Sequence, residues 1–473
     1  MKRQFRSYGN PNFPSWEYIP DGEPHVFGGR LYVYGSHDFF NGHAFCLGDY
    51  LCWSAPVEDP TLWTCEGVIY KKTDDPLNRA DTMCLYAPDV TQGSDGRFYL
   101  YYVLDKVSIV SVAVSDSPSG PFSFYGYVCH PDGTLLGSAP GDEPQFDPGV
   151  LTEGDTTWLS TGFCPPGDRS RTGPMVSRLG PDMLTLVSGP KNLLPSQPYS
   201  GGSGFEGHEY FEAACIRKIG ETYYFIYSSI VFHELCYATS NRPDGGFVYR
   251  GVLISNNDMH IGSYKDPGKP AYYGGNNHGS IVCLNGAWYV FYHRHTHGTS
   301  FCRQSCAEPI ELRADGSFVQ AEMTSRGIRG SPLPGKGEYP AFIACNLWCN
   351  TESAYTAWAA HPDNRYPLIT QEGRDGDELD GYISNMMDGA TAGFKYFNFS
   401  GARYISIRVR GYCKGVFIVS IQPVGPAVAR IPVEFTNVWT KYTAPLEIPD
   451  GTHALYFRYE GEGRASLASF DLQ

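Results

Sequence analysis

The 473-residue sequence has no long hydrophobic run, and this narrows the class of protein before any motif is considered. No stretch is apolar for long enough to span a bilayer, and the polar, proline-rich N-terminus has no apolar segment of the kind that directs secretion. We therefore expect a cytoplasmic protein, or a secreted one whose leader has been removed. Sustained helical periodicity is also missing, which disfavours an α-helical fold.

Positive charge is scarce. The formal net charge is −14, and lysine and arginine form no basic patch and no stripe interleaved with aromatics. This argues against nucleic acids and anionic membrane surfaces as partners. The charge suits a neutral or cationic ligand, and it is equally what an ordinary soluble acidic protein carries. Nothing in the sequence predicts the oligomeric state.

The 14 cysteines lack the compact spacing of a disulfide framework. Several lie in strand-like runs, and without an export signal we expect free thiols. Cys302 and Cys306 are close in sequence, but no matching histidine or cysteine pair accompanies them. A zinc site is therefore not predicted there.

Aromatic residues, glycine and proline are what the sequence has in abundance. Aromatics make up 15% of the chain, led by 34 tyrosines, and the 54 glycines and 35 prolines are spread along it. Short tyrosine-rich runs separated by Gly, Pro, Asn and Asp are typical of an all-β protein. The length predicts two domains, because a single core rarely grows this large.

One sequence unit recurs five times: a polar lead residue, a short apolar run, a turn and an aromatic-rich strand. The copies begin roughly 58 to 68 residues apart, with the lead residues Asp21, Asp89, Asp147, Glu212 and His278. An aromatic follows each lead residue by ten or eleven positions, at Tyr32, Tyr99, Trp158, Tyr223 and Trp288. Each copy holds a hairpin and enough sequence for two more strands. We predict a five-bladed β-propeller, with a sandwich of accidentally similar hairpins as the alternative.

The lead residues suggest chemistry. The innermost strand of each blade lines the central channel, so equivalent positions converge on the axis. Like charges crowded around one axis repel one another and resist desolvation, so four carboxylates beside one imidazole are tolerated mainly where a reaction or a cation requires them. Paired carboxylates cleave glycosidic bonds, and in inverting enzymes the base and the acid stand roughly 6.5–9.5 Å apart.

The repeats resemble glycoside hydrolase family 43, the inverting five-bladed propellers that act on arabinofuranosides and β-xylosides. The matching stretches lie within about residues 10–325 and are IPDGEPHVF, YAPDVT with GRFYLYY, FDPGVLTEGD, FEAACIRKIGETYYFIYS and NNHGSIVCLNGAWYVFYH. The resemblance implies that Asp21 is the general base, with Glu23 as its rival. It implies that Glu212 is the general acid, rather than its upstream neighbours Glu206 and Glu209.

Three further residues take roles from the same resemblance. Asp89 matches the third carboxylate, which orients the acid and raises its pKa, as a neighbouring negative charge should. His278 matches the histidine that supports a cation, such as a structural calcium, or its water shell on the propeller axis; a core histidine is the alternative. Arg303 matches a substrate-contacting arginine, or else closes the propeller by an ion pair. Asp147 is expected to be structural, and no cofactor is required for the chemistry.

The repeat ends after Phe318, so we assign the propeller to residues 1–324. Residues 325–340 are rich in Gly, Pro and charge and predict a linker. Residues 341–473 show alternating short strands, typical of a β-sandwich. This region resembles carbohydrate-binding module family 6, a jelly roll, which implies that Tyr382 and Trp439 clamp a sugar ring. A departure is Ser466, where that family has an asparagine, and the alternative is a domain that only buttresses the propeller.

We therefore predict an inverting, exo-acting glycoside hydrolase that releases α-L-arabinofuranosyl or β-D-xylosyl residues from plant hemicellulose oligosaccharides. The long insertion at residues 38–85 favours exo action because it can close one end of a groove. An endo-arabinanase is an alternative within the same class. A non-catalytic carbohydrate-binding propeller is the alternative from another class, and three intact carboxylates argue against it.

Overall fold

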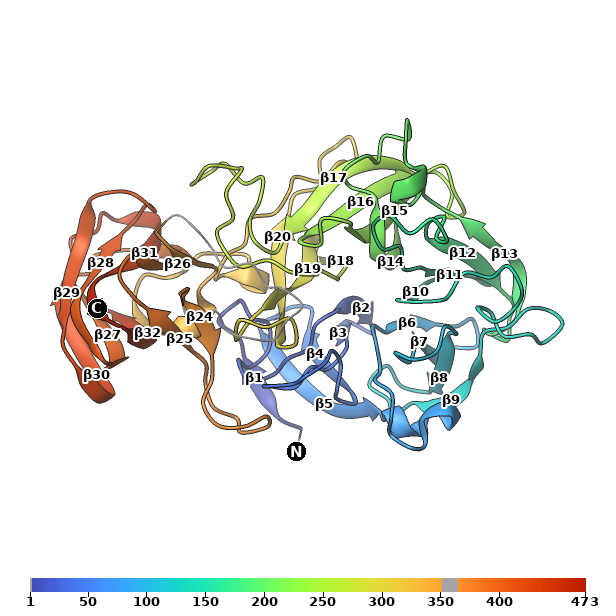
Figure 1. Ribbon diagram of the computed structural model, residues 1–473, viewed down its shortest axis with the longest axis horizontal. Helices are drawn as coiled ribbons and strands as arrows, with labels where there is room; N and C mark the ends of the chain where they lie inside the picture. Colours follow the sequence, from blue (N-terminus) through green and yellow to red (C-terminus); the bar gives the residue numbers. More distant parts are fainter. Residues whose placement is uncertain (1, 351–364) are drawn as a thin grey trace.

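The computed structural model describes residues 2–350 and 365–473, and the regular secondary structure in these ranges is almost entirely β-strand (Figure 1). The helical elements described are single 3₁₀ turns, namely η1 (Lys72–Asp74), η2 (Pro76–Asn78), η3 (Gln197–Tyr199), η4 (Gly327–Arg329) and η5 (Ala341–Ile343). No helix in the described residues is long and apolar enough to cross a membrane. All 14 cysteines are free thiols, as predicted.

Five antiparallel sheets follow one another along the chain and form the propeller (Figure 1). The first blade is β2 (Glu23–Phe27), β3 (Arg30–Tyr34), β4 (Tyr50–Pro56) and β5 (Leu62–Tyr70), with β1 (Gln4–Arg6) on its outer edge. The second is β6 (Asp89–Gln92), β7 (Phe98–Tyr102), β8 (Ser111–Ser115) and β9 (Ser123–Tyr127). The third is β10 (Gly149–Glu153), β11 (Thr156–Thr161), β12 (Met175–Leu179) and β13 (Leu186–Asn192).

The fourth blade is β14 (Tyr210–Ile219), β15 (Thr222–Ser229), β16 (Glu234–Ser240) and β17 (Val248–Ser255). The fifth has three strands where four are expected, and these are β18 (Ile281–Leu284), β19 (Ala287–His295) and β20 (Arg303–Ile310). The N-terminal segment takes the place of the fourth strand. Asn12 donates its backbone N–H to Ser305 (2.9 Å), and the Asn10 side chain contacts Ala307 and Glu308.

The innermost strands contact one another in the order β2, β6, β10, β14, and β18 contacts β2. A parallel bridge between Gly22 and Gly279 joins the first and fifth blades. Closure of the ring leaves no exposed edge on the axis. The predicted five-bladed propeller is therefore confirmed, and its five inner strands present their first residues to one central site.

Two six-stranded sheets form the C-terminal sandwich. The first has the order β21 (Leu333–Pro334), β26 (Ala390–Phe399), β31 (Gly451–Gly463), β28 (Cys413–Ser420) and β29 (Ala427–Val433), with β23 (Asn346–Cys349) also on β26. The second has β24 (Leu368–Thr370), β25 (Tyr382–Met386), β32 (Ala465–Leu472), β27 (Tyr404–Gly411) and β30 (Thr436–Pro445), with β22 (Gly337–Pro340) also on β32. Phe394, Phe457 and Phe470 pack between the sheets.

The segment 325–340, expected as a linker, is built into the sandwich. It supplies β21 to one sheet and β22 to the other, and Leu333 and Tyr339 are buried in the core. Its glycines and prolines provide turns, while the apolar residues between them bury surface. This corrects the predicted linker and moves the start of the sandwich before residue 341.

The propeller and the sandwich share one buried interface. A single apolar cluster runs from Ile254 and Tyr292 of the propeller to Phe342 of the sandwich side. The buried Arg294 guanidinium donates to the backbone oxygens of Phe342 and Ala344, both at 2.7 Å. Buried hydrogen bonds of a charged donor are among the stronger ones. The second unit is thus packed against the propeller and not tethered to it.

Candidate active site

A cavity of about 270 Å³ lies where the five blades meet. Each blade contributes one residue at or just before its innermost strand, and these are Asp21, Ala87, Asp147, Glu212 and His278. We call this set the rim layer. The remaining lining residues are Phe45, Cys46, Tyr86, Phe146, Phe163, Asn276 and Arg303. Three carboxylates, an imidazole and a guanidinium therefore face one small, aromatic-walled space.

Asp21 is held in its ionised form. Arg303 donates from Nη1 to Asp21 Oδ1 at 2.9 Å, and His293 Nδ1 lies 3.3 Å from the same oxygen and from the Asp21 N–H. Burial alone would raise the pKa of Asp21, but Arg303 and His293 together hold it far below its ordinary value. Asp21 also has a φ of +57°, a conformation that non-glycine residues rarely adopt outside functional sites.

Glu212 is in the opposite electrostatic state. Burial raises the pKa of Glu212 well above its ordinary value, and the neighbouring Asp147 raises it further. The local fold aims the side chain inward: the pairing of β14 with β15 shifts on both sides of Glu212, and Ala213 has a φ of +66°. Such a bulge redirects a strand residue. Glu212 is thus a carboxylic acid kept protonated toward neutral pH.

Asp147 is the third carboxylate of the pocket. Its Oδ2 accepts the backbone N–H of Ala213 at 3.2 Å, directly beside Glu212, and lies 3.5 Å from His278 Nδ1. Burial raises the pKa of Asp147, and the nearby Asp21 adds to this although His278 opposes it. Asp147 therefore both orients the backbone at Glu212 and supplies like-charge repulsion to it.

His278 stands between two layers of carboxylates. Its Nδ1 faces Asp147 and Asp21 (3.5 and 4.0 Å), and its Nε2 is 3.6 Å from Glu23. Burial would lower the pKa of His278, but its contacts with Asp147 and Glu23 raise it well above the ordinary value. An imidazolium here offsets part of the negative charge of the site.

Arg303 is fixed from behind by Asp38. The Arg303 Nε and Nη2 donate to the two Asp38 oxygens at 2.8 and 3.0 Å, and the guanidinium lies 4.7 Å from the centre of the Phe45 ring. A bidentate pair of this kind sets the direction of the remaining donor. That donor, Nη1, points at Asp21. Arg303 thus lies at the site, as predicted. Its partner Asp38 belongs to the insertion at residues 38–85.

Asp89 lies outside this pocket. Its Oδ1 is 2.6 Å from His25 Nε2, its Oδ2 accepts the Val150 N–H at 2.8 Å, and Arg217 Nη1 is 3.6 Å away. Arg217 also pairs with Glu23. We call Glu23, His25, Asp89 and Arg217 the inner layer. Although burial would raise the pKa of Asp89, Arg217 and His25 lower it.

This placement corrects the third carboxylate that the repeat assigned. Side chains at positions i and i+2 of a strand share a face, so Ala87 and Asp89 both point to the axis but at different depths. Ala87 is the rim residue of the second blade, and Asp147, expected to be structural, fills the position beside Glu212. The sequence does contain a signal for the rim positions. An aromatic residue (Tyr86, Phe146 or Phe211) directly precedes the rim residues Ala87, Asp147 and Glu212.

The rivals of the two main candidates lie elsewhere. Glu23 belongs to the inner layer. Glu206 is exposed and accepts backbone N–H groups of its own turn, from Gly202 and Gly204. Glu209 is bonded to Ser200 Oγ at 2.7 Å. None of these three lines the cavity.

Tyr382 and Trp439 are brought together in the sandwich, but not as an open clamp. Their rings meet edge to face, with centroids 5.4 Å apart and planes inclined by 71°. The Arg410 guanidinium lies 4.3 Å from the Trp439 ring centre and 5.4 Å from that of Tyr382, and it pairs with Glu372. A sugar ring would need the faces that Arg410 covers.

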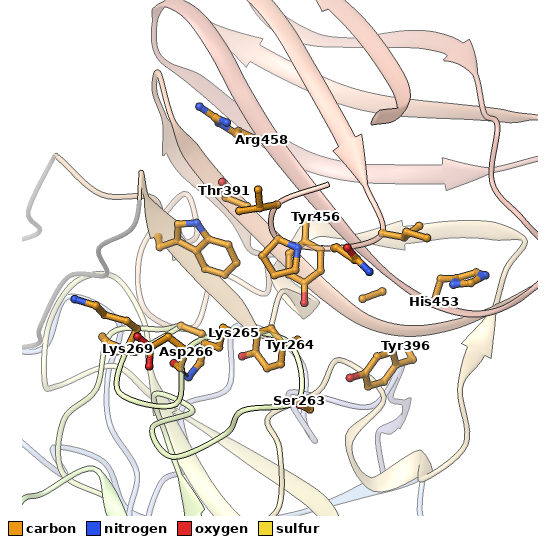
Figure 2. Close-up of a pocket in the computed structure, with 18 of the residues that line it drawn as sticks. Ser263, Tyr264, Lys265, Asp266, Lys269, Thr391, Tyr396, His453, Tyr456 and Arg458 are labelled. Atoms are coloured by element: carbon orange, nitrogen blue, oxygen red, sulfur yellow. Dashed lines mark hydrogen bonds between the residues drawn. The ribbon is translucent and has the colours of Figure 1, made fainter. Parts of the chain in front are cut away.

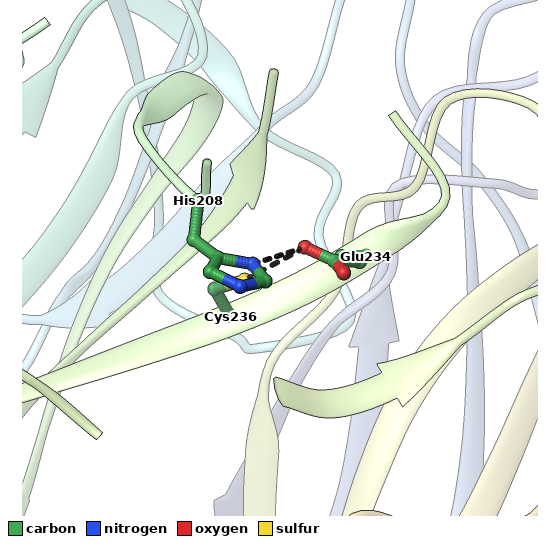
Figure 3. Close-up of side chains that lie close together, drawn as sticks. All are labelled: His208, Glu234 and Cys236. Atoms are coloured by element: carbon green, nitrogen blue, oxygen red, sulfur yellow. Dashed lines mark hydrogen bonds and ion pairs between the residues drawn. The ribbon is translucent and has the colours of Figure 1, made fainter. Parts of the chain in front are cut away.

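A separate titratable cluster lies on the fourth blade (Figure 3). His208 Nδ1 and His260 Nε2 contact the two oxygens of Glu234 at 2.7 and 3.0 Å, and the Cys236 thiol is 3.5 Å from the same carboxylate. Burial raises the pKa of Glu234, but the imidazole of His208 brings it down to about 2. The two imidazoles satisfy the hydrogen-bonding capacity of the Glu234 carboxylate. The cluster does not line the rim-layer cavity.

A closed propeller whose central pocket holds one ionised carboxylate and one protonated carboxylic acid has the acid–base pair that a glycoside hydrolase needs. The sequence comparisons agree. The family model for glycosyl hydrolases family 43 matches residues 57–318, and a xylosidase/arabinosidase of Thermoclostridium stercorarium is 65% identical over 98% of both chains. The chain belongs to glycosyl hydrolases family 43.

Solved structures show the same architecture. A family 43 arabinoxylan arabinofuranohydrolase from Bacillus subtilis covers 99% of this chain and 97% of its own, with a TM-score of 0.52 at 22% identity, and so supports the fold across both units. A family 43 β-xylosidase/α-arabinofuranosidase from a compost metagenome, solved with xylotriose, covers 68% of this chain and 98% of its own, with a TM-score of 0.53 at 27% identity.

Proposed function

We propose that this glycoside hydrolase releases single terminal pentose residues, α-L-arabinofuranosyl or β-D-xylosyl, with inversion of configuration. The observation that carries the proposal is the electrostatic division of the rim layer. Asp21 is held ionised by Arg303, while Glu212 is held protonated by burial and by Asp147. A base and an acid whose pKa values are driven apart can act in one step on opposite faces of a sugar.

Asp21 is the proposed general base. With its pKa far below neutral it stays ionised at working pH and accepts a hydrogen bond from a water molecule. Because Asp21 is a weak base, it accepts the proton of the water molecule only when that water already attacks the oxocarbenium-like anomeric carbon. Arg303 and His293 fix the carboxylate, so the water is held in one position.

Glu212 is the proposed general acid, and Asp147 takes the supporting role that the sequence assigned to Asp89. Glu212 donates its proton to the glycosidic oxygen as that bond breaks. Asp147 keeps the pKa of Glu212 high by repulsion and holds the Ala213 N–H next to it. An inner-layer carboxylate neutralised by Arg217 and His25 does not supply this repulsion.

Exo action on a pentose is supported by the size and walls of the cavity. About 270 Å³ is at or below the lower end of sites that bind drug-sized ligands, which suits one sugar ring. Phe45 and Cys46, from the long insertion, close one side, and Tyr86, Phe146 and Phe163 offer apolar faces to C–H groups. The two pentoses are those in the names of the relatives. An endo-arabinanase would need a groove open at both ends.

A cation beside His278 stays a prediction. Oxygens of Asp21, Glu23 and Asp147 lie 3.5–4.0 Å from the imidazole nitrogens, and carboxylate oxygens are the ligands that calcium prefers. A metal bound to the imidazole itself would require its neutral form, in competition with the proton that these carboxylates favour. The acid and base roles above involve only side chains of the chain.

A panel of p-nitrophenyl glycosides tests the substrate, with α-L-arabinofuranoside, β-D-xyloside and β-D-galactoside as the members. We expect hydrolysis of one or both pentosides and at most trace activity on the galactoside. Proton NMR of the first turnovers should show the anomer opposite to that of the substrate. Retention of configuration would remove the roles of Asp21 and Glu212 together.

A further inference from the structure

A second cavity, of about 870 Å³, lies between the propeller and the sandwich (Figure 2). One side is the segment from Ser263 to Ala271 in the loop between β17 and β18. The other side is formed by β23, β26 and β31 and by the turn at residues 421–424. We call this space the interdomain pocket. It is separate from the rim-layer cavity and shares no lining residue with it.

The sandwich side presents a flat row of side chains. Trp348 pairs with Thr391 on the next strand, and Thr391 pairs with Arg458 on the strand after that, so the three share one face. Tyr456 lies on the same face two residues before Arg458. The Trp348 and Tyr456 ring centroids are 5.9 Å apart. Trp348 is half-buried, so part of its surface faces the pocket.

The propeller side is held in place by buried polar contacts. Tyr264 accepts a hydrogen bond from Asn346 Nδ2 at 3.0 Å, and the Lys395 ammonium lies 3.8 Å from its ring centre. Lys395 is fully buried and pairs with Asp258 and Glu322 of the propeller at 3.1 and 2.8 Å. Two surfaces fixed in this way form a pocket that need not be assembled on binding, which lowers the entropic cost of a ligand.

The lining offers polar groups with unused hydrogen-bonding capacity. The Tyr456 hydroxyl and the His453 Nε2 are buried and have no hydrogen-bond partner among the described residues. Such groups are rare in folded proteins. Lys269 and Gln422 are exposed at the edge of the pocket. Lys265 also lines it, and its ammonium donates to the backbone oxygens of Ile261 and Asp266, both at 3.3 Å. Aromatic faces ringed by donors and acceptors suit a hydroxyl-rich, extended ligand, which is the chemistry of an oligosaccharide.

One loop connects the two cavities. Ala271 lines the interdomain pocket and Asn276 lines the catalytic cavity, and both belong to the segment between β17 and β18. Five residues of fully extended chain span at most about 18 Å. The two cavities therefore border one short stretch of chain, whose ends at Ala271 and Asn276 are at most about 18 Å apart.

We propose that the interdomain pocket is an accessory site that binds a hemicellulose chain of the polysaccharide substrate. This inference rests on the proposed function for the class of ligand. It also assigns polysaccharide binding by the second unit to the face around Trp348, and not to Tyr382 and Trp439, whose rings Arg410 covers.

The test compares two tryptophans in the full chain. In an Asp21→Asn background, which slows turnover by at least roughly 10², Trp348→Ala should weaken binding to soluble arabinoxylan at least about tenfold by affinity electrophoresis, because it removes the stacking face. Trp439→Ala is the matched control and should leave the affinity unchanged. Trp348→Phe should retain most of it. In an otherwise native chain, Trp348→Ala should hydrolyse p-nitrophenyl pentosides at the native rate.

A second variant guards against misfolding of Trp348→Ala, which a thermal melt would reveal. Lys269→Ala combined with Gln422→Ala changes only exposed residues and should weaken arabinoxylan binding roughly fivefold or more. Unchanged affinity in a folded Trp348→Ala chain, or a loss confined to Trp439→Ala, would overturn the accessory site. Absence of activity on every aryl pentoside would instead overturn the proposed function, and the arabinoxylan comparison would still be readable.

Discussion

The two layers of charged side chains on the propeller axis differ in how their carboxylates are neutralised. In the inner layer, Asp89 and Glu23 share Arg217, and His25 stands against Asp89. In the rim layer, Asp147 and Glu212 face a cavity with only His278 between them and the inner layer. The pKa of Asp89 is accordingly lowered, while those of Asp147 and Glu212 are raised.

This difference distinguishes a structural carboxylate from a catalytic one. Removing a buried carboxylate that is paired with cations leaves the partner charge uncompensated and destabilises the fold. A buried carboxylate without a full complement of cations costs stability, and it persists where its raised pKa is useful. Asp21 is the one rim residue that is fully paired, and this suits a base that must stay ionised.

The largest effect should come from Asp21→Asn. Loss of a general base costs roughly 10²–10⁴ in kcat, and the lost orientation of the water adds to this. The kcat on the best aryl pentoside is the measurement. Glu23→Gln, two residues away in the inner layer, is the control, and it should lower the thermal midpoint more than the activity. More than a tenth of native activity in Asp21→Asn would contradict its role.

Glu212→Ala should separate substrates by their leaving group. A dinitrophenolate departs without a proton, so the rate of its release should fall little. A sugar alkoxide requires protonation by the acid, so the rate of oligosaccharide hydrolysis should fall by roughly 10²–10⁴. The measurement is the ratio of activities on a dinitrophenyl pentoside and on the matching oligosaccharide. An equal loss on both substrates would show that Glu212 is not the proton donor.

Asp89→Asn should damage stability more than catalysis. Removing one partner of a buried charge pair costs about 3–5 kcal/mol, because Arg217 and His25 lose the charge they face. Since the folded-state pKa of Asp89 is lowered, its contribution is present above the unfolded value, about 3.9, and is lost as the pH falls through the folded value. The difference in denaturant midpoint between variant and native chain should therefore be large at pH 7 and shrink in acid. A constant difference would contradict the pairing.

The fold was largely predictable because the sequence unit that forms one blade occurs five times along the chain. The aromatic offsets mark the second strand of each blade, and Asp21, Glu212, His278 and Arg303 do meet at one cavity. Two features of the fold could not be read in this way. The missing outer strand of the fifth blade is replaced by residues near Asn12, and the expected linker joins both sandwich sheets.

The third carboxylate was misplaced because the strand period is two. A shift of two residues preserves the face of the strand, so the repeat pattern alone cannot distinguish Ala87 from Asp89. Depth along the axis depends on which neighbours compensate the charge, and Arg217, which decides this for Asp89, lies 128 positions later in the sequence. The covering of Trp439 by Arg410 is likewise a contact between separate strands.

The pH dependence of Asp147→Asn beside Asp89→Asn tests the two-layer account most directly. Activity requires protonated Glu212, so it falls as the pH rises through the pKa of that residue. Burial and then Asp147 raise this pKa, so Asp147→Asn should lower it and move the alkaline limb of kcat/KM for an aryl pentoside to lower pH. Asp89→Asn, measured where it remains folded, should leave the limb in place. A limb that moves in Asp89→Asn and stays fixed in Asp147→Asn would contradict the account.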